Sequence, residues 1–540
     1  MYRLFTSILL LLFALNANAQ NVVQPREYRA VWLTTLQGLD WPRTKATDAA
    51  SVERQQDELR LMLDQLQAAG INTVLLQTRI RGTVAYPSVI EPWDVAFTGR
   101  AGQNPGYDPL RFAIDEAHRR GMELHAWVVA FPLGKLAGEK ALGRQALTKQ
   151  HPELCLRAGE GWMMDPGVPE TADYIARLCT EIVSNYDVDG IHLDYIRYPE
   201  TQIAFNDDKT YRRYGGGMPK RAWRSNNVTG VVRKIHDAVK AQKPWVKLSC
   251  SPVGKYADLP RQSSKGWNAR DAVSQDAVSW LRDGLMDVLF PMMYFDGNNF
   301  YPFALDWKER CPEGQVAPGL GIYLLAPQER NWPLQAVQRQ LTFIENFGLD
   351  GFALFRARFL TDDVKGLYGW LQNVRCRQQA RTPACPSQQP MPLAPEAQLT
   401  QSGHTLHFRW KRQAGTIYNI VYRYDENGAA VELARLKNAT AFDYTPALPV
   451  MRNARYGIVT EDVYGRESQP AYLQLGVLRV DADSTVVATV DTLEGLPTAY
   501  YDLQGRRILC NNNSPHRQRF RQLRQLNPRG EGFTLSIERY

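Results

Sequence analysis

The segment DVDGIHLDYIRYPE, from Asp187 to Glu200, places charged side chains in an otherwise apolar stretch. If its centre is a β-strand, side chains alternate between the two faces, so His192 and Asp194 lie on the same face. A carboxylate buried without a partner is costly. Asp194 is therefore either a functional group at the end of the strand or one half of a structural ion pair with Arg197 or Arg79. Its position on the strand favours the functional explanation.

The surrounding sequence predicts a repeated strand–helix pattern. From Arg26 to about Asn373, β-rich runs alternate with amphipathic stretches, several of which end in Gly. The eight candidate strands are EYRAVWLTTL, INTVLLQTRI, MELHAWVVAF, GIHLDYIRYP, VKLSCSPVG, MDVLFPMMYF, QVAPGLGIY and LDGFALFRARF. Eight such units predict an α/β fold, a closed (β/α)₈ TIM-type barrel whose apolar parallel strands are covered by helices. An open doubly wound sheet is the alternative, but TTLQGLDWP lacks the Gly-rich phosphate turn that this sheet would require.

The rest of the chain divides into smaller segments. We expect a signal peptide over 1–19, the barrel over 20–377 and a linker over 378–394 that is rich in Pro and Gln. Short alternating strands then predict a β-sandwich of the fibronectin type III kind over 395–478, with Trp410 in its core. A small C-terminal β unit or appendage over 479–540 completes the chain.

The N-terminal residues predict export. MYRLFTSILLLLFALNANAQ combines an early Arg, a short apolar run and an A-x-A motif that would leave Gln20 as the mature start. No later apolar run is long enough to span a bilayer. We therefore expect a secreted protein in the periplasm or on the outer cell surface of a Gram-negative bacterium. In an oxidising compartment, Cys376 and Cys385 could pair across a short polar loop.

The composition is that of an ordinary globular protein, with 44% apolar and 22% charged residues. The net charge of +8 is modest for 540 residues, and part of it comes from an Arg-rich tail that we interpret as solvated. We therefore expect no nucleic-acid partner.

Candidate binding residues follow from the predicted barrel, because its active site lies at the carboxyl ends of the strands. Aromatic side chains there could stack on sugar rings, while Arg, His and amide groups bind hydroxyl or carboxylate groups. The predicted substrate-binding residues are Trp32, Gln77, Arg79, Arg81, His125, Trp127, His192, Arg197, Tyr294, Tyr323 and Arg356.

Five blocks of the sequence together resemble the glycosyl-hydrolase-like family 10, a former domain of unknown function. These blocks are REYRAVWLTTLQGLDWP, LLQTRIRGTVAYPSVIEPWD, GYDPLRFAIDEAHRRGMELHAWVV, DGIHLDYIRYP and DVLFPMMYF, and they cover roughly Arg26 to Trp370. The resemblance implies a TIM-type barrel that cleaves glycosidic bonds, with bacterial cell-wall (peptidoglycan) glycan as one substrate class of the family.

The same resemblance implies roles for residues of the fourth strand. DGIHLD is similar to the fourth-strand motif of retaining barrel glycosidases, which makes Asp194 the nucleophile or oxocarbenium stabiliser, positioned by His192 and Arg197. The chain departs from many family members in having Tyr195 where they have a second Asp, and RGTVAYPS and HAWVVAFPLGK also differ from the usual forms. Near the C-terminus, YYDLQGRRI resembles the appendage domains of secreted Bacteroidetes proteins.

Glycoside hydrolysis normally needs a second carboxyl group, for which the sequence offers several candidates. Asp296 comes first, because an apolar and aromatic setting would favour its protonated form. Glu91 in the second strand's loop comes next, and Glu200 follows.

We expect no cofactor and no metal, because no metal-ligand spacing is present. Two alternatives remain: a barrel that binds glycan without cleaving it, and a metal-dependent carbohydrate deacetylase, which would need His125 and His192 within about 4 Å of each other and a third ligand.

Overall fold

The computed structural model describes residues 25–260, 262, 266–424, 430–446 and 454–474, together with the backbone of three short strands further along the chain. The described residues form two compact units, one from Pro25 to Pro386 and one that starts at Ser387. The segment expected to be a linker, 378–394, is thus divided between them, and the expected signal peptide lies outside the described residues. Among the residues described, no helix has the length and apolar character needed to cross a membrane.

A parallel sheet forms the centre of the first unit, and each of the eight expected segments contributes to it. Its strands are β1 (Tyr28–Leu33), β2 (Thr73–Ile80), β4 (Glu123–Val129), β8 (Gly190–Asp194), β9 (Lys247–Cys250), β10 (Val288–Leu289), β11 (Gln315–Val316), β12 (Gly319–Leu320) and β13 (Gly351–Phe355). The strands are hydrogen-bonded in the order β11-β10-β9-β8-β4-β2-β1-β13-β12, and the short β3 (Thr83–Val84) pairs antiparallel with β2. Ala317 and Pro318 alone separate β11 from β12, so the curled sheet begins and ends in the same segment.

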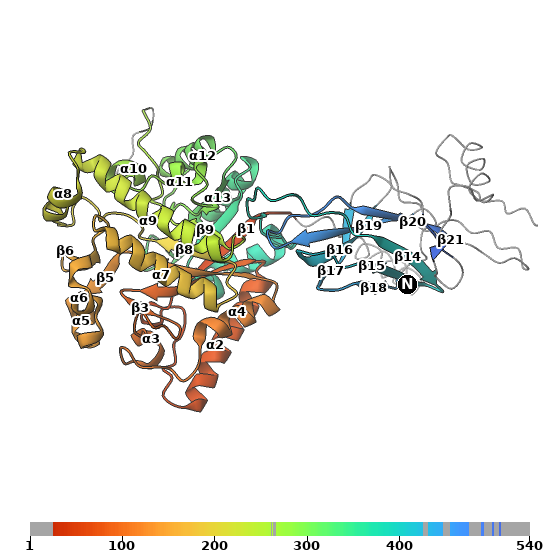
Figure 1. Ribbon diagram of the computed structural model, residues 1–540, viewed down its shortest axis with the longest axis horizontal. Helices are drawn as coiled ribbons and strands as arrows, with labels where there is room; N and C mark the ends of the chain where they lie inside the picture. The colour runs from red at the N-terminus through yellow and green to blue at the C-terminus, as the bar shows by residue number, and fades with distance from the viewer. Residues whose placement is uncertain are drawn as a thin grey trace, which may run out of the picture. The chain divides into compact units, whose positions relative to one another are not determined.

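Helices alternate with these strands along the chain and lie around the sheet (Figure 1). They are α2 (Ala49–Ala68), α3 (Val95–Thr98), α4 (Pro109–Arg119), α7 (Pro169–Asn185), α9 (Lys220–Gln242), α10 (Ala269–Ala272), α11 (Ala277–Arg282), α12 (Tyr301–Arg310), α13 (Leu334–Asn346), α14 (Ala357–Thr361) and α15 (Leu367–Trp370). Local sequence sets their ends. At α2, the Asp48 carboxylate accepts from the Ser51 backbone N–H while the Ser51 hydroxyl accepts from the Asp48 N–H, which is a capping box.

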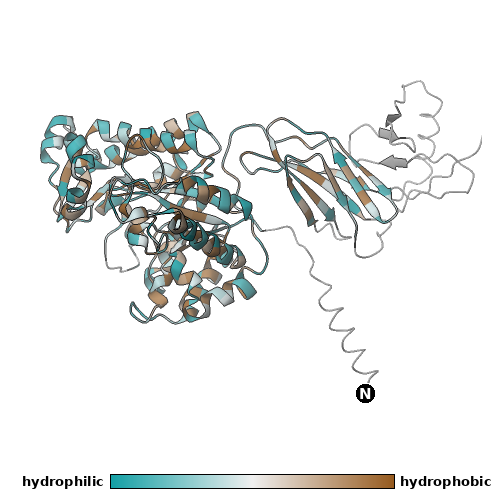
Figure 2. Ribbon diagram, turned by 90° about the horizontal axis from the view of Figure 1, so that it is seen from below, coloured by the Kyte–Doolittle hydropathy of each residue, from teal (hydrophilic) through white to brown (hydrophobic). Residues whose placement is uncertain are grey.

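Two apolar layers follow from the alternation of side chains along the strands. One face of the strands packs against the helices in a large core that includes Val31, Leu76 and Leu193. The opposite face encloses a smaller cluster that includes Trp32 and Trp127. Apolar residues gather on the strands and on the helix faces turned toward them, and polar residues on the outer helix faces (Figure 2).

Two long loops at the carboxyl ends of β4 and β8 carry structure of their own. The first contains the three-stranded sheet β5-β7-β6, with β5 (Pro132–Lys135), β6 (Cys155–Ala158) and β7 (Gly161–Met164), and the helices α5 (Leu136–Leu142) and α6 (Leu147–Gln150). The second contains α8 (Asp208–Tyr214). A hydrogen bond from the Gly159 N–H to the Ala204 carbonyl (3.0 Å) joins the two loops.

The second unit contains two antiparallel sheets, ordered β14-β15-β18 and β17-β16-β19-β20. Their strands are β14 (Ala397–Ser402), β15 (Thr405–Trp410), β16 (Thr416–Tyr424), β17 (Ala430–Lys437), β18 (Ala441–Tyr444), β19 (Arg455–Asp462) and β20 (Ala471–Gln474). One apolar cluster contains residues of both sheets, Trp410 among them. Further along the chain, β21 (Ala488–Val490), β22 (Ala499–Tyr501) and β23 (Arg507–Ile508) form a small antiparallel sheet.

The disulfide considered between Cys376 and Cys385 is not formed, since both thiols are free and buried. They face different surroundings: Cys376 packs against Gly70, and the Cys385 sulfur lies 3.9 Å from the Lys240 ammonium group. Burial raises the pKa of Cys376 to about 11 and that of Cys385 to about 12, so both remain protonated thiols at neutral pH.

Candidate active site

Asp194 is the last residue of β8, at the carboxyl end of the parallel sheet, and its side chain is only 5% exposed. Three groups donate hydrogen bonds to its carboxylate. The indole Nε1 of Trp127 donates to Oδ2 (3.1 Å), while the Ser251 hydroxyl (2.8 Å) and the Tyr195 backbone N–H (2.8 Å) donate to Oδ1. Every partner is a donor, so the surroundings are arranged for a carboxylate ion rather than a carboxylic acid.

Burial and hydrogen bonding act in opposite directions on this carboxyl group. Burial raises the pKa of Asp194 above its usual value, and the Ser251 hydrogen bond, the charge of Arg197 and the Tyr195 N–H offset part of that rise. The result is a desolvated carboxylate that is fixed in position, which is the state required of a nucleophile or of a group that stabilises a developing positive charge.

Two serines of the neighbouring strand support the polar residues of β8, and they are absent from the predicted site. His192 lies opposite Ser249, and the Ser251 N–H bonds to the Leu193 carbonyl, so both serines face the same interior as His192 and Asp194. The alternation in VKLSCSPVG carries this signal, because Ser249 and Ser251 are spaced like His192 and Asp194.

His192 lies one inward-facing position before Asp194 and is a neutral, fully bonded histidine. The Trp32 indole donates to its Nε2 (3.0 Å), so Nδ1 carries the proton and donates to the Ser249 hydroxyl (2.9 Å). Burial lowers the pKa of His192 well below its usual value. Trp32 and His192 thus form a rigid layer beneath Asp194, and neither presents a free polar atom to a substrate.

Arg197 lies between two aromatic rings beside Asp194. Its guanidinium is 4.6 Å from the centre of the Tyr195 ring and 4.9 Å from that of Trp267, and it pairs with Glu200 (2.9 Å). Tyr195 adopts a left-handed backbone conformation (φ 50°), which is rare for a bulky residue, and its side chain is 40% exposed. The chain therefore turns sharply after Asp194 and presents an aromatic ring to solvent next to it.

Further aromatic residues come from the carboxyl ends of the last strands. Tyr294 stacks on Phe355 (5.3 Å between ring centres) and meets the edge of Tyr323 (5.9 Å). Burial, and after it the charge of Asp194, raises the pKa of Tyr294. Of the predicted binding residues, Trp127 bonds directly to Asp194 and Arg197 lies three residues after it, while Tyr294 and Tyr323 form an aromatic cluster with Phe355.

The predicted catalytic residue Glu91 lies elsewhere. Arg79 donates to both of its carboxylate oxygens (2.8 and 2.5 Å), Tyr174 donates to it as well (3.1 Å), and the Arg79 and Glu91 side chains are 0% and 1% exposed. A β-bulge between Gln77 and Arg79 explains the location, since one extra residue turns Arg79 to the outer, helix-covered face of the sheet. Arg79 and Glu91 neutralise each other there, away from Asp194.

The other candidate carboxylates are not buried beside Asp194 either. Asp296 is solvent-exposed, several residues beyond the short β10, so the apolar surroundings expected for it are absent. Glu200 is held by Arg197. Among the described residues, no second carboxylate shares a hydrogen-bond partner with Asp194.

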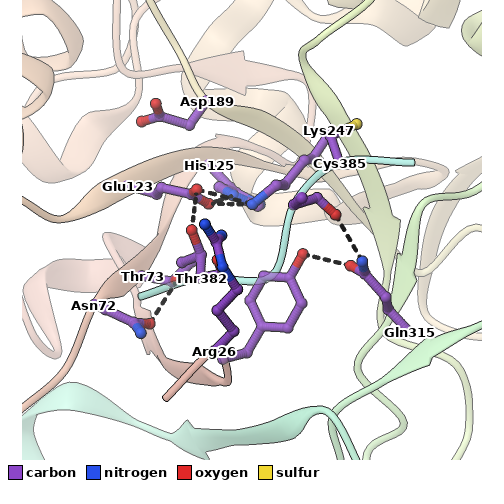
Figure 3. A network of polar contacts seen from close by, with 12 residues as sticks. Arg26, Asn72, Thr73, Glu123, His125, Asp189, Lys247, Gln315, Thr382 and Cys385 are labelled. Atoms are coloured by element: carbon purple, nitrogen blue, oxygen red, sulfur yellow. Dashed lines mark hydrogen bonds and ion pairs between the residues drawn. The ribbon is translucent and has the colours of Figure 1, made fainter. Parts of the chain in front are cut away.

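His125 lies near the amino ends of the strands, in a polar network opposite to the Asp194 end (Figure 3). Its Nε2 bonds to Glu123 (3.1 Å), which also pairs with Lys247 (2.8 Å) and accepts a hydrogen bond from the Thr382 hydroxyl. Burial alone would raise the pKa of Glu123, but Lys247 and His125 outweigh it and lower that pKa below its usual range. Since His125 is the third residue of β4, its position in the strand explains why it does not reach the site.

The remaining predicted binding residues brace the loops around the site. Gln77 accepts hydrogen bonds from the Thr34 hydroxyl (2.7 Å) and from the backbone after β1. Arg356 forms an ion pair with the buried Asp40. Arg81 is exposed, with a left-handed backbone (φ 57°), and packs against Gly134 of β5.

The histidines offer no metal site in the part of the chain that the structure describes. No group of three or more His, Cys, Asp or Glu side chains there could hold a metal ion, and both ring nitrogens of His192 already have partners. The ligand set that a metal-dependent deacetylase requires is therefore missing from these residues.

A buried carboxylate at the carboxyl end of a curled parallel sheet is typical of barrel enzymes. The chain matches the family Glycosyl hydrolase-like 10 over residues 27–322, and it belongs to that family. It is 35% identical over 298 residues to the glycosyl hydrolase DigH of Escherichia coli (strain K12), which covers 52% of this chain and 67% of DigH. It is also 35% identical over 305 residues to the glycosyl hydrolase YngK of Bacillus subtilis (strain 168), covering 54% of this chain and 58% of YngK.

Solved structures give a weaker likeness. An alpha-L-fucosidase isoenzyme 2 from Paenibacillus thiaminolyticus matches 65% of this chain and 49% of its own, with 15% identity and a TM-score of 0.44. The PgaB (BpsB) glycoside hydrolase domain from Bordetella bronchiseptica matches 64% of this chain and 98% of its own, with 11% identity and a TM-score of 0.44.

Proposed function

We propose that this protein is an exported glycoside hydrolase that cleaves glycosidic bonds in a polysaccharide, with bacterial cell-wall glycan strands as the first substrate to test. The proposal includes a closed (β/α)₈ barrel and a fibronectin type III-like sandwich after it. Family membership and two glycosyl hydrolase relatives support the reaction class. The N-terminal sequence supports export.

The observation that carries the proposal is the state of Asp194. It is buried at a strand end, held by three donors and followed directly by the exposed Tyr195. A carboxylate of this kind can attack the anomeric carbon or stabilise the oxocarbenium-like transition state, while the aromatic rings stack on the sugar faces. Its three hydrogen-bond partners are all donors, and they favour the role of nucleophile or stabilising carboxylate over that of proton donor.

The general acid must then be a different group. Glu200 is a poor candidate, since its carboxylate is already engaged by Arg197 (2.9 Å). Asp296 remains our proposed acid, because it is exposed on the loop that follows Tyr294 and a bound glycan would cover it and remove it from water.

The test is release of reducing ends from a panel of glycans that includes peptide-free peptidoglycan strands. We expect Asp194→Asn to lose activity by about 10²–10⁴-fold or more, and Asp296→Asn to lose it by about 10²-fold. Asp57→Asn is the matched control, because this carboxylate is exposed on the outer helix α2 and should leave the rate unchanged. Activity that survives Asp194→Asn would remove the carboxylate of β8 from the mechanism.

A glycan-binding barrel without catalysis is the second candidate, and it has an observation in its favour. No second carboxylate of the described residues shares a partner with Asp194, and Tyr195 stands where many family members have an Asp. Tight binding of a glycan by the wild type, without release of reducing ends under any condition of the assay, would select this function.

A further inference from the structure

A cavity of about 340 Å³ opens between the two long loops that follow β4 and β8. Its lining includes Arg157 and Gly159 from the first loop, and Phe205, Asn206 and Asp208 from the second, with Lys220 from the start of α9. The hydrogen bond between Gly159 and Ala204 (3.0 Å) fixes the two loops to each other. The volume lies in the range of small-ligand sites.

Arg157 is the cation available to a ligand in this cavity. Its side chain is exposed, and within the described part of the chain it forms no ion pair; its guanidinium makes one long hydrogen bond, to the Gly159 carbonyl (3.5 Å). The guanidinium lies 5.0 Å from the centre of the Trp162 ring. A stacked guanidinium presents its N–H fork in one orientation, which suits a carboxylate.

The platform under Arg157 is itself held in place. The Trp162 indole donates to Glu139 (2.7 Å), and Glu139 also accepts from the Thr148 hydroxyl (2.6 Å). Arg157 on β6 lies opposite Trp162 on the paired strand β7. The orientation of the guanidinium is therefore largely set before a ligand binds, which lowers the entropic cost of binding.

The other lining groups are those that a sugar ring requires. Phe205 supplies an aromatic surface and packs on the buried Tyr198 (5.8 Å between ring centres). Asn206 and Asp208 can bond to hydroxyl groups. Lys220 is already paired with Asp207 (2.7 Å) and Asp208 (2.5 Å), so it does not compete with Arg157 for an anion.

The cavity is on the same side of the sheet as Asp194, because both of its loops start at carboxyl ends of strands. The second loop starts directly after Asp194, passes Tyr195 and Arg197, and reaches the cavity at Ala204. A glycan chain that lies along this loop can contact the carboxylate with one sugar and the cavity with another.

We propose that this cavity is a remote subsite for a sugar residue that carries a carboxylate, with Arg157 binding that carboxylate. The inference rests on the proposed function, since it concerns the same glycan. It adds that the substrate is an acidic glycan and that Arg157 determines this preference.

The experiment compares two forms of one ligand: peptide-free peptidoglycan strands, whose lactyl groups are free carboxylates, and the same strands after the carboxylates have been amidated. Binding is measured on the full chain carrying Asp194→Asn, so that the result does not depend on turnover. We expect Arg157→Ala to weaken binding of the acidic strands by about tenfold and to leave binding of the amidated strands unchanged. Arg157→Lys keeps the charge but loses the fork, and we expect an intermediate loss.

Lys135→Ala is the control, because this lysine is an exposed cation on β5 of the same three-stranded sheet, pairs with Glu160 and does not line the cavity. It should leave both affinities unchanged. The subsite is refuted if Arg157→Ala changes neither affinity, or if it weakens both forms of the strand equally. A wild type that binds acidic strands through Arg157 but never cleaves them would instead refute the hydrolase and leave the subsite standing.

Discussion

Ser249 and Ser251 lie two residues apart and face the same interior, yet they act on groups of different charge. Ser251 donates to the ionised carboxylate of Asp194, whereas Ser249 bonds to the neutral ring of His192. A hydrogen bond to a charged group contributes more than one between neutral groups. The two hydroxyls therefore form a matched pair for measuring how Asp194 is kept ionised.

The pH dependence of activity should report the Ser251 hydrogen bond. Burial already holds the pKa of Asp194 above its usual value, and the Ser251 bond lowers it toward that value. Removing this bond raises the pKa of Asp194 further. When the solution is acidified, the variant's carboxylate therefore becomes protonated at a higher pH than that of the wild type. We expect Ser251→Ala to move the acidic limb of the kcat/KM profile upward by about one pH unit.

Ser249→Ala serves as the control for that shift, because His192 carries no charge. Its acidic limb should coincide with that of the wild type, even if the rate itself falls. An equal shift in both variants would show that loosening of the strand, rather than the bond to Asp194, moves the limb.

At the scale of the elements, the bulge in β2 shows where sequence reasoning reaches its limit. Strict alternation along INTVLLQTRI places Gln77 and Arg79 on the same face, but the structure separates them. A bulge depends on how the partner strand pairs, and the residue types in β2 do not predict it. The same limit applies to Trp267, which reaches Arg197 from a loop without periodicity.

The outward position of Arg79 makes Glu91 a structural residue, and its replacement should affect stability. Glu91→Gln would leave the Arg79 guanidinium buried without a counter-charge. We expect the free energy of unfolding to fall by about 3–5 kcal/mol, measured by urea denaturation. Glu153→Gln, at an exposed position paired with His151, should change it by less than about 0.5 kcal/mol. If Glu91→Gln is as stable as the wild type, water must reach the Arg79–Glu91 ion pair.

Two glycines of the first unit should respond to alanine in opposite directions. A Cβ at Gly190 would lie 2.5 Å from His125 Nδ1, and the ring cannot retreat easily because Glu123 holds its other nitrogen. We expect Gly190→Ala to lower the free energy of unfolding by about 1–3 kcal/mol. Gly230 lies within α9 and a Cβ there would meet nothing within 4 Å, so Gly230→Ala should raise it by about 0.5–1 kcal/mol.

Thermal or urea unfolding of both variants measures these changes. If Gly190→Ala is as stable as the wild type, the amino-terminal ends of β4 and β8 must be less closely packed than the structure has them. If both variants are destabilised, an alanine side chain at Gly230 must be unfavourable for a reason other than backbone entropy.

At the scale of the whole molecule, the strand–helix alternation predicts the elements well because it follows from burial. Each of the eight expected segments contributes a strand to the sheet, since apolar runs bounded by turns have few other ways to exclude water. The alternation does not predict how far a residue beyond a strand lies from the sheet. Asp296 follows Tyr294 by two residues, yet β10 ends at Leu289 and the chain has left the sheet before it reaches this carboxylate.

The segment after Cys376 is where the predicted boundary and the packing differ, and it yields the last prediction. Residues 378–386, expected to be a free linker, belong to the first unit. The Gln378 carbonyl accepts a hydrogen bond from Arg29 (2.6 Å), Thr382 donates to Glu123, and the Ala384 carbonyl accepts from Gln315 (2.7 Å). These bonds satisfy polar groups at the amino ends of the strands that would otherwise be exposed to water or left unpaired.

Two truncated chains should therefore differ in stability although they differ by only nine residues. We expect residues 25–386 to fold and unfold cooperatively, with a stability close to that of the first unit in the full chain. A chain of residues 25–377 would leave Glu123, Arg29 and Gln315 without these partners. Each lost bond to a buried group costs about 1–3 kcal/mol, so its free energy of unfolding should be lower by about 3 kcal/mol or more in urea denaturation. Equal stability of the two chains would mean that residues 378–386 act only as a linker. The polar network of Glu123, His125 and Lys247 would then be stable without the hydrogen bonds from this segment.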